Sequence, residues 1–284
     1  MVEPISLIAT GAIIGGVAGK FTEKVWNLGE KWVTDYFSNH GAKAQENAKN
    51  NTLDFLNKLA IRVKNLEKED KKNKKLIENS LSHPGFSILL QKAMLSSAQT
   101  EDKQKHELLA RLISDRLSKQ SESIHSLTSK LAVDAISSMT INQLKLVALS
   151  LSLSYTVPKQ ISVPINSNEM YNDLINEWIS LRFEKLLDIE FSRLDLAHLE
   201  ALSCITFIGF ASVDLSSLIV KKFEHEKFKF NFKEFIETET GKKTKFLWDK
   251  GICSVNLTSL GQLIGVYVSD MITGTNTNLP QEWG

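Results

Sequence analysis

The chain has 284 residues and a formal net charge of +1 at pH 7, and 42% of its residues are hydrophobic and 24% are charged. These values are typical of a soluble globular protein with room for two domains, and they exclude a strong overall field toward nucleic acid or anionic lipid. Two cysteines are too few for a disulfide framework, so we expect a reducing, cytoplasmic environment with Cys204 and Cys253 buried as small apolar side chains.

Residues 1–40 combine a glycine-rich apolar run with an amphipathic stretch. Gly11, Gly15 and Gly19 recur at every fourth position, so they share one face of a predicted helix. Each costs about 1 kcal/mol against alanine inside a helix, and small residues at this spacing let a second helix approach closely. Trp26 and Trp32 follow among charged residues, as in an interfacial anchor. We predict that these five residues form a helix-packing or membrane face.

Other interpretations of this stretch are a phosphate loop and ordinary packing. A P-loop is excluded because Ile14 and Phe21 stand where it needs glycine and a hydroxyl residue. The apolar run ends at Lys20 after about 15 residues, whereas a membrane span needs roughly 20. The run also lacks the basic start and the cleavage site of a signal peptide. Docking on the same protein, or packing in an oligomer, remains the alternative to membrane insertion.

Residues 41–157 are predicted to form a helical domain. Leucines spaced three and four apart indicate one long amphipathic helix over 42–80, which ends in a mixed charge run. After a break at "HPGF" we expect further helices over 87–99, 100–120, 121–139 and 140–157. Thr100 is the expected cap of the second of these, and Thr140 with Gln143 has the spacing of a capping box at the last.

A change in composition follows. Residues 158–168 carry proline, serine and asparagine and are predicted to be a linker before a helical domain over 169–284. In that domain we expect a helix over 171–189 and a leucine-rich helix after Ser192.

The end of the chain has the most regular pattern. It is predicted to run through a helix, a basic turn, an apolar helix or strand, a stop at Gly251 in the αL conformation, a short extended segment and a helix capped by Thr258. This order is typical of winged-helix-like modules. Lys242, Lys243 and Lys245 fall at the predicted turn, where they are candidate contacts to a nucleic-acid backbone; a solvated loop is the alternative.

No catalytic set is complete in the sequence. The patterns H-E-x-x-H, C-x-x-C and G-x-S-x-G are absent, and the six histidines are scattered. Fragments at 101–103 and 225–227 resemble parts of a metal nuclease, but such a site also needs an aspartate from a strand, and few strands are expected. We therefore predict that the protein is not an enzyme and has no cofactor and no metal.

The segment "LWDKGICSVNLTSLGQLIGVYVSD", the helix "LLARLISDRL" and the glycine-containing first helix together resemble uncharacterised bacterial proteins related to the abortive-infection alpha family. The resemblance covers most of the chain and brings no catalytic residues. It implies a role in defence against phage, in which an infected cell stops growing or dies.

The sequence thus predicts a mostly α-helical protein with a glycine-striped first helix and a winged-helix-like end. The function we expect is that of a non-enzymatic effector or accessory protein of antiphage defence, which associates with itself, with a protein partner or with a membrane surface. We expect it in the cytoplasm or at the periphery of the inner membrane. The alternative is a helical regulatory module that binds a partner protein or nucleic acid, although the near-neutral charge disfavours nucleic acid.

Overall fold

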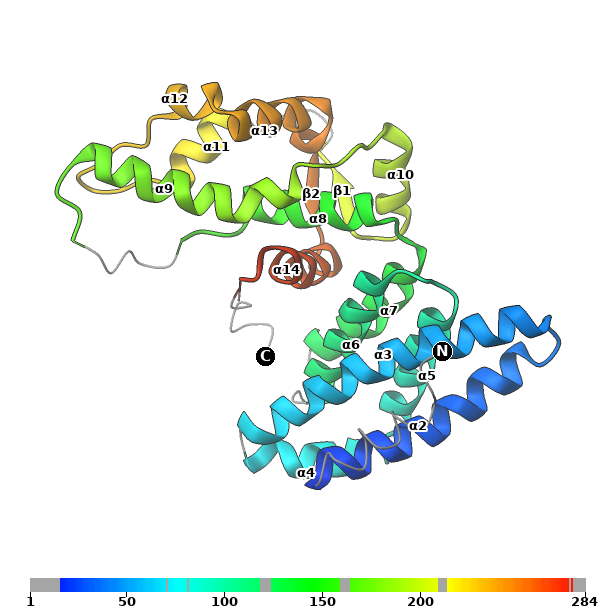
Figure 1. Cartoon of the computed structure of the whole chain (residues 1–284). Helices are drawn as coiled ribbons and strands as arrows, with labels where there is room; N and C mark the ends of the chain where they lie inside the picture. Colours follow the sequence, from blue (N-terminus) through cyan, green and yellow to red (C-terminus); the bar gives the residue numbers. More distant parts are fainter. Residues whose placement is uncertain are drawn as a thin grey trace. The chain divides into compact units, whose positions relative to one another are not determined.

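The computed structural model describes residues 16–69, 71–80, 82–117, 124–158, 164–208, 214–275 and 277. These residues are mostly helical, as predicted, and contain one two-stranded sheet (Figure 1). They divide into two compact units, the first ending at Ser138 and the second beginning at Met139. Within the described ranges, no helix is both long enough and apolar enough to cross a membrane.

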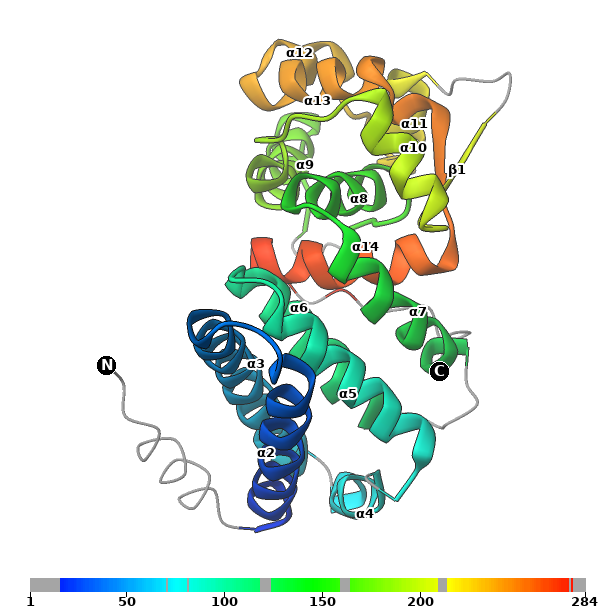
Figure 2. The same cartoon turned by 90° about the vertical axis from the view of Figure 1, so that its right-hand side faces the viewer.

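The first unit is a bundle of helices built around one long helix. Its described helices are α2 (Gly16–Phe37), α3 (Ala42–Glu69), α4 (Lys71–Ser80), α5 (Pro84–Ala98), α6 (Lys103–Leu117) and α7 (Ile124–Ser138). Helix α3 packs against α2, α5 and α6 (Figure 2). Its buried residues Phe55, Leu59 and Val63 recur at every fourth position and so form the apolar stripe that a core-facing helix needs.

The long helix predicted over 42–80 is interrupted. Helix α3 ends at Glu69, and α4 begins at Lys71, inside the mixed charge run. The side-chain amide of Asn73 donates a hydrogen bond of 2.9 Å to the carbonyl of Leu66. The last turn of a helix leaves its carbonyl groups without backbone partners, and this bond satisfies one of them. The end of α3 therefore involves the side chain of Asn73, which hydrophobic periodicity does not reveal.

One predicted cap is confirmed and one is wrong. The amide of Gln143 donates to the Thr140 hydroxyl at 3.2 Å, and the Thr140 amide donates to the Gln143 side chain at 3.0 Å, which completes the capping box. Helix α6 is capped by Asp102 instead of Thr100, because the Asp102 carboxylate accepts two backbone amides of the first turn at 2.8 and 3.4 Å. Thr100 accepts the amide of Asp102 at 3.2 Å and so orders the preceding turn.

The second unit contains shorter helices and both strands. Its described elements are α8 (Ile141–Ser154), α9 (Asn168–Phe183), η1 (Glu184–Leu186), α10 (Arg193–Ala201), β1 (Ile205–Phe207), α11 (Leu215–Lys222), α12 (Phe232–Glu237), α13 (Glu239–Lys250), η2 (Ile252–Ser254), β2 (Val255–Leu257) and α14 (Ser259–Thr273). Helices α8 and α14 pack against each other (Figure 1).

Glycine allows α8 and α14 to approach closely. A Cβ atom at Gly265 would lie 3.0 Å from Cβ of Leu151 and 3.1 Å from the carbonyl oxygen of Val147, both on α8. One turn further along α14, the hydroxyl groups of Ser269 and Ser152 lie 3.4 Å apart. Gly261, Gly265 and Ser269 therefore place a small-residue stripe at every fourth position of α14, the spacing singled out in the N-terminal run.

The leucine-rich helix predicted after Ser192 is α10, and it is followed by a strand. Helix α10 ends at Ala201, Ser203 adopts φ 57°, and β1 follows. Strand β1 pairs antiparallel with β2, with Ile205 opposite Leu257. Strand β2 is the short extended segment predicted there, and Thr258 caps α14 as expected, accepting the amide of Gly261 at 3.1 Å. Helices α11, α12 and α13 separate the two strands in sequence.

The boundary between the units lies before the predicted linker at 158–168. Helix α8 was assigned to the domain over 41–157, but it belongs to the second unit because it packs on α14. Its residues from Leu146 to Leu153 are buried, and a helix that is apolar all round belongs in a core. Helix α2, predicted as a separate region over 1–40, belongs to the same unit as α3.

Candidate functional site

A groove of about 350 Å³ lies between α2 and α3 in the first unit. Its apolar lining includes Trp26, Val33 and Phe37 from α2, and Leu53 and Leu56 from α3. Val33, Phe37 and Leu56 are also buried, so the floor of the groove is the edge of the hydrophobic core. A lining of this kind can receive another apolar side chain without further rearrangement.

Gly29 determines how deep the floor lies. A Cβ atom at this position would stand 2.8 Å from Cε of Met94 on α5 and 3.6 Å from Cδ1 of Leu56 on α3. The missing side chain lets the backbone of α2 rest against both helices. Because such close-packed helices tolerate little extra volume, the shape of the groove is fixed by the core below it.

The rim of the groove is polar and exposed. Lys49 forms an ion pair of 3.0 Å with Glu30, and each side chain is 49% exposed. An exposed pair of this kind contributes less than about 1 kcal/mol, so it opens readily. The lining therefore resembles a surface that holds an apolar helix along its floor and polar side chains at its edge. Thr34 and Gln45 are further exposed residues of the rim.

The predicted packing face is distributed over described and undescribed parts of the chain. Gly11 and Gly15 lie outside the described residues. Gly19 is buried in the first turn of α2, Trp26 lines the groove, and Trp32 is half-buried on the same helix. The structure thus brings one residue of the predicted face, Trp26, to the groove.

Helix α2 begins with a reversal of backbone conformation. Gly16 has φ 88°, a value that glycine adopts readily and that a right-handed helix does not contain. The carboxylate of Glu67 on α3 then accepts the amides of Val17 and Ala18, each at 3.1 Å. A negative charge at this end of a helix is favourable. Helix α2 is therefore anchored at its own N-terminus by a side chain of α3.

This cap gives a direct prediction. In a Glu67→Ala variant two amides lose their acceptor, so we expect the first unit to lose about 1–2 kcal/mol of stability. Hydrogen exchange of the first-turn amides of α2 is the measurement. Glu69→Ala removes an exposed carboxylate from the same helix end and is the matched control. Equal protection in the two variants would contradict the capping role.

The three candidate nucleic-acid contacts do not lie at a turn. Lys242, Lys243 and Lys245 lie within helix α13, where a turn was predicted. Thr238 caps the start of this helix. Each lysine has an acidic partner: Glu237 at 3.4 Å, Glu239 at 2.8 Å and Asp249 at 2.6 Å, respectively. The hydrogen bond with Glu239 raises the pKa of Lys243. Local pairing reduces the positive field that these lysines offer to a phosphate.

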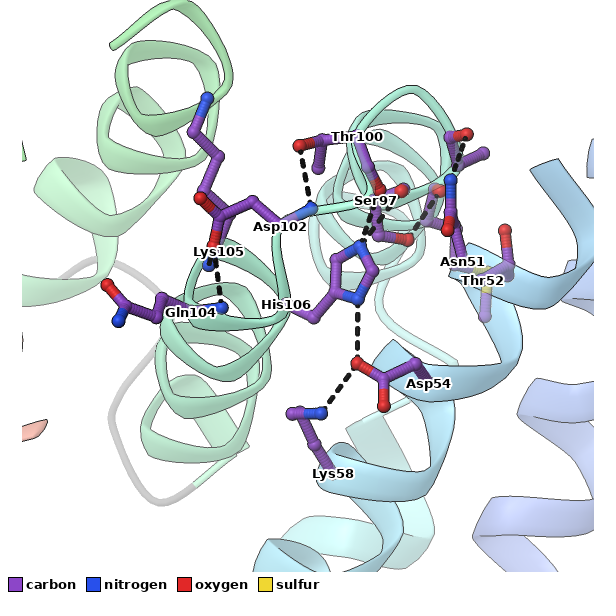
Figure 3. A network of polar contacts seen from close by, with 12 residues as sticks. Asn51, Thr52, Asp54, Lys58, Ser97, Thr100, Asp102, Gln104, Lys105 and His106 are labelled. Carbon is purple, nitrogen blue, oxygen red and sulfur yellow. Dashed lines mark hydrogen bonds and ion pairs between the residues drawn. The ribbon is translucent and has the colours of Figure 1, made fainter. Parts of the chain in front are cut away.

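His106, which is 1% exposed, lies at the centre of a polar network in the first unit (Figure 3). One ring nitrogen, Nδ1, lies 2.8 Å from a carboxylate oxygen of Asp54, within hydrogen-bond distance. The other, Nε2, faces the carbonyl oxygens of Ser97 and Thr100 at 3.1 and 2.9 Å. Both ring nitrogens therefore have oxygen partners, and the ring is held from two sides.

The Asp54–His106 pair resembles half of a catalytic triad but has a structural role. Burial raises the pKa of Asp54, but hydrogen bonds from Lys58 and His106 outweigh it and lower the pKa overall. In a triad the second ring nitrogen faces a nucleophile, whereas here two main-chain carbonyls occupy it. The network joins α3 to the loop between α5 and α6.

A second polar cluster lies in the second unit around Lys222, at the end of α11. Its ammonium group donates to the carbonyl of Leu153 at 2.9 Å and to that of Ser152. These are carbonyls of the last turn of α8, where a cation is favourable. The ammonium also stands 5.3 Å from the centre of the Trp178 ring. Burial and the nearby charge of Arg182 lower the pKa of Lys222 to about 7.

Arg182 connects this cluster to the end of α14. It donates to the Thr277 hydroxyl at 2.8 Å and lies 3.8 Å from the carboxylate of Asp270, whose side chain is fully buried. Asp270 also accepts the amide of Thr277 at 2.9 Å and the hydroxyl of Thr275 at 2.9 Å. The carboxylate thus holds the chain that follows α14.

The sequence gives no signal that singles out this cluster. Lys222 stands in a segment with several other lysines, and its partner carbonyls are 69 and 70 residues away. The burial predicted for both cysteines is confirmed for one of them. Cys204 is buried as predicted, which raises its pKa to about 12, but Cys253 is partly exposed.

The described residues contain no group of three or more His, Cys, Asp or Glu side chains arranged to hold a metal ion. The candidate sites in this part of the chain are the α2–α3 groove and the polar clusters around His106 and Lys222.

Comparison with known proteins identifies one relationship. A family model matches residues 19–247, which is more than half of the chain, and the function of that family is unknown. No curated protein and no solved structure matches the chain. The chain therefore belongs to this protein family of unknown function.

Proposed function

We propose that the protein is a non-enzymatic effector or accessory protein of bacterial antiphage defence that acts by helix-mediated association. The single observation that carries this proposal is the groove between α2 and α3. Its buried apolar floor and its weak, exposed ion pair suit an apolar helix as the bound partner. The partner in this association is a second copy of the chain, another protein or the surface of the inner membrane.

The antiphage setting rests on the resemblance of the quoted N-terminal, central and C-terminal segments to proteins related to the abortive-infection alpha family. In that setting, association would be the step that stops the growth of an infected cell. The alternative is a regulatory module whose winged-helix-like end contacts a partner protein or nucleic acid. The acidic partners of Lys242, Lys243 and Lys245 make the nucleic-acid form of this alternative the weaker one.

The groove can be filled without altering the core. Thr34 is an exposed residue of its rim, so a Thr34→Trp variant places a large side chain over the floor. We expect this variant to keep its helical content and to lose at least tenfold of its protection against phage in a plating assay, because the partner helix is excluded. Circular dichroism measures the helical content.

Asp35→Trp is the matched control. Asp35 is also exposed on α2 but does not line the groove, and its side chain points about 100° away from that of Thr34. It should protect as the unaltered protein does. If both tryptophan variants protect fully, the groove is not a functional surface. If the unaltered protein gives no protection against any phage tested, the defence role is wrong.

A further inference from the structure

We propose that the α2–α3 groove of one copy of the chain binds helix α7 of a second copy, so that copies associate head to tail. This inference deepens the proposed function and rests on it, because it names the partner that the groove receives. Its support is an exposed apolar surface on α7 and α5, the charges beside that surface and beside the groove, and the places of the two surfaces on the first unit.

Helix α7 has exposed apolar side chains on one face. Leu127 and Leu131 are 44% and 58% exposed, and they lie on the same face because they are four residues apart. Ile88 on the neighbouring helix α5 is 57% exposed. We call these three side chains the α7 ridge. Contiguous apolar side chains left in water mark a surface that binds a partner, whereas isolated ones need no explanation.

Contacts between α5 and α7 place Ile88 beside the two leucines. One turn after Ile88, the ammonium group of Lys92 lies 2.6 Å from the carboxylate of Asp134. Shortly before Ile88, a Cβ atom at Gly85 would lie 3.7 Å from the ammonium nitrogen of Lys130. The two helices therefore run in the same direction here, and Ile88 comes level with the leucines of α7. The α7 ridge is thus one apolar surface that extends over two helices.

The α7 ridge and the groove match in form. Helices bind in apolar grooves through side chains spaced three, four or seven residues apart, and Leu127 and Leu131 have this spacing. These two residues are about 6 Å apart along the helix axis, at 1.5 Å per residue. The lining of the groove extends roughly 16 Å along α2, from Trp26 to Phe37. Both leucines therefore fit over the apolar floor at the same time.

The unpaired charges beside the two surfaces are opposite in sign. Lys130 precedes Leu131 on α7 and has no acidic partner among the described residues. Glu46 lines the groove on the side of α3, and within the described part of the chain it has no basic partner. A cation at the ridge and an anion at the groove favour the encounter of these two surfaces over contact between two grooves.

Each surface also has one exposed ion pair at its edge. Lys92 pairs with Asp134 beside the α7 ridge, and Lys49 pairs with Glu30 on the rim of the groove. All four side chains are about half exposed, so each pair contributes less than about 1 kcal/mol. Because both pairs are weak, their members can exchange partners across an interface. The edges of the two surfaces therefore remain paired when the apolar parts meet.

The α7 ridge and the groove lie on different sides of the first unit. Figure 2 shows α5 and α6 between α7 and the pair α2 and α3, and both intervening helices pack against α3 and against α7. The ridge of one copy can therefore reach only the groove of another copy. A contact of this kind leaves one ridge and one groove free, so it builds rings or open chains instead of closed dimers.

Two variants that each remove one surface test this contact. Thr34→Trp fills the groove and keeps the ridge, whereas Leu131→Glu places a charge on the ridge and keeps the groove. Light scattering of the unaltered chain, over a roughly hundredfold range of concentration, should reach masses above that of a dimer. Each variant alone should have the mass of one chain. An equimolar mixture of the two should double that mass and stop there, because it offers one intact ridge to one intact groove.

Ser137→Glu is the matched control. Ser137 is exposed on α7, but its side chain points about 120° away from that of Leu131, so this variant should assemble as the unaltered chain does. Leu131→Ala shortens the ridge without adding a charge and should move assembly to about tenfold higher concentration. Circular dichroism should show the same helical content in all of these chains, because each altered residue is exposed.

Other outcomes overturn the proposal. An unaltered chain that stays monomeric leaves another protein or a membrane surface as the partner of the groove. If the chain stops at a dimer that Thr34→Trp dissociates and Leu131→Glu does not, two grooves face each other. If the mixture of folded variants stays monomeric, the ridge and the groove do not bind each other. None of these readouts depends on phage protection. Loss of protection in Thr34→Trp without any association of copies would keep the proposed function and remove this inference.

Discussion

Gly261→Ala is expected to lower the free energy of unfolding of the second unit by about 3 kcal/mol or more, the upper end of the effects of overpacking. A Cβ atom at this position would lie 2.0 Å from the carbonyl oxygen of Cys204. That oxygen accepts both the amide and the hydroxyl of Thr258, each at 3.1 Å, so it cannot move away without breaking the bonds that start α14. Alanine has a higher helix propensity than glycine, so propensity alone would make this variant more stable. A loss of stability would therefore come from the steric contact.

Two other glycines make this a graded series. Gly265→Ala brings Cβ to 3.0 Å from a side-chain atom of Leu151, which can shift slightly, so we expect a loss of about 1 kcal/mol. Gly41→Ala meets no atom within 4 Å and should be neutral or slightly stabilising. Urea unfolding followed by circular dichroism measures all three. If Gly261→Ala is as stable as Gly41→Ala, the contact between α14 and Cys204 is wrong.

Sequence reasoning succeeded where a feature depends on near neighbours. The capping box at Thr140 and the cap at Thr258 use residues three positions apart, and the apolar character of α8 is visible in its own composition. The same reasoning failed at Thr100, because Asp102 is an equally good cap two residues later.

The candidate site depends on contacts that the sequence does not show. The groove exists because α2, α3 and α5 meet at Gly29, and Met94 is 65 positions away from it in the chain. The spacing of the N-terminal glycines predicts a packing face, and Gly261 and Gly265 have the same spacing and lie in close contact with Cys204 and with α8. Spacing identifies a smooth face of a helix; the neighbour that makes the face useful is determined by tertiary packing. Strand β1 was missed for the same reason, since its partner β2 lies about fifty residues further along.

The second large expected effect concerns pH. Between pH 7 and 8.5 we expect the free energy of unfolding of the second unit to rise, by as much as about 1.4 kcal/mol per pH unit. Burial and the neighbouring charge of Arg182 lower the pKa of Lys222 to about 7 in the folded protein. In the unfolded chain a lysine has a pKa near 10.4. Between these two pKa values the unfolded state binds more protons at Lys222 than the folded state does. The free energy of unfolding therefore increases as the pH rises.

The interval ends at about pH 8.5 because Cys204 then contributes with the opposite sign. Burial raises the pKa of its thiol to about 12, so above the ordinary thiol pKa the unfolded chain is the state that has lost a proton. Urea unfolding at a series of pH values, followed by tryptophan fluorescence, measures the slope. Lys222→Met should flatten it between pH 7 and 8.5, whereas Lys221→Met, a change at the exposed neighbour, should leave it intact. A slope that persists in Lys222→Met would show that another group titrates. It would contradict the conclusion that burial against α8 and Trp178 destabilises the charged form of Lys222.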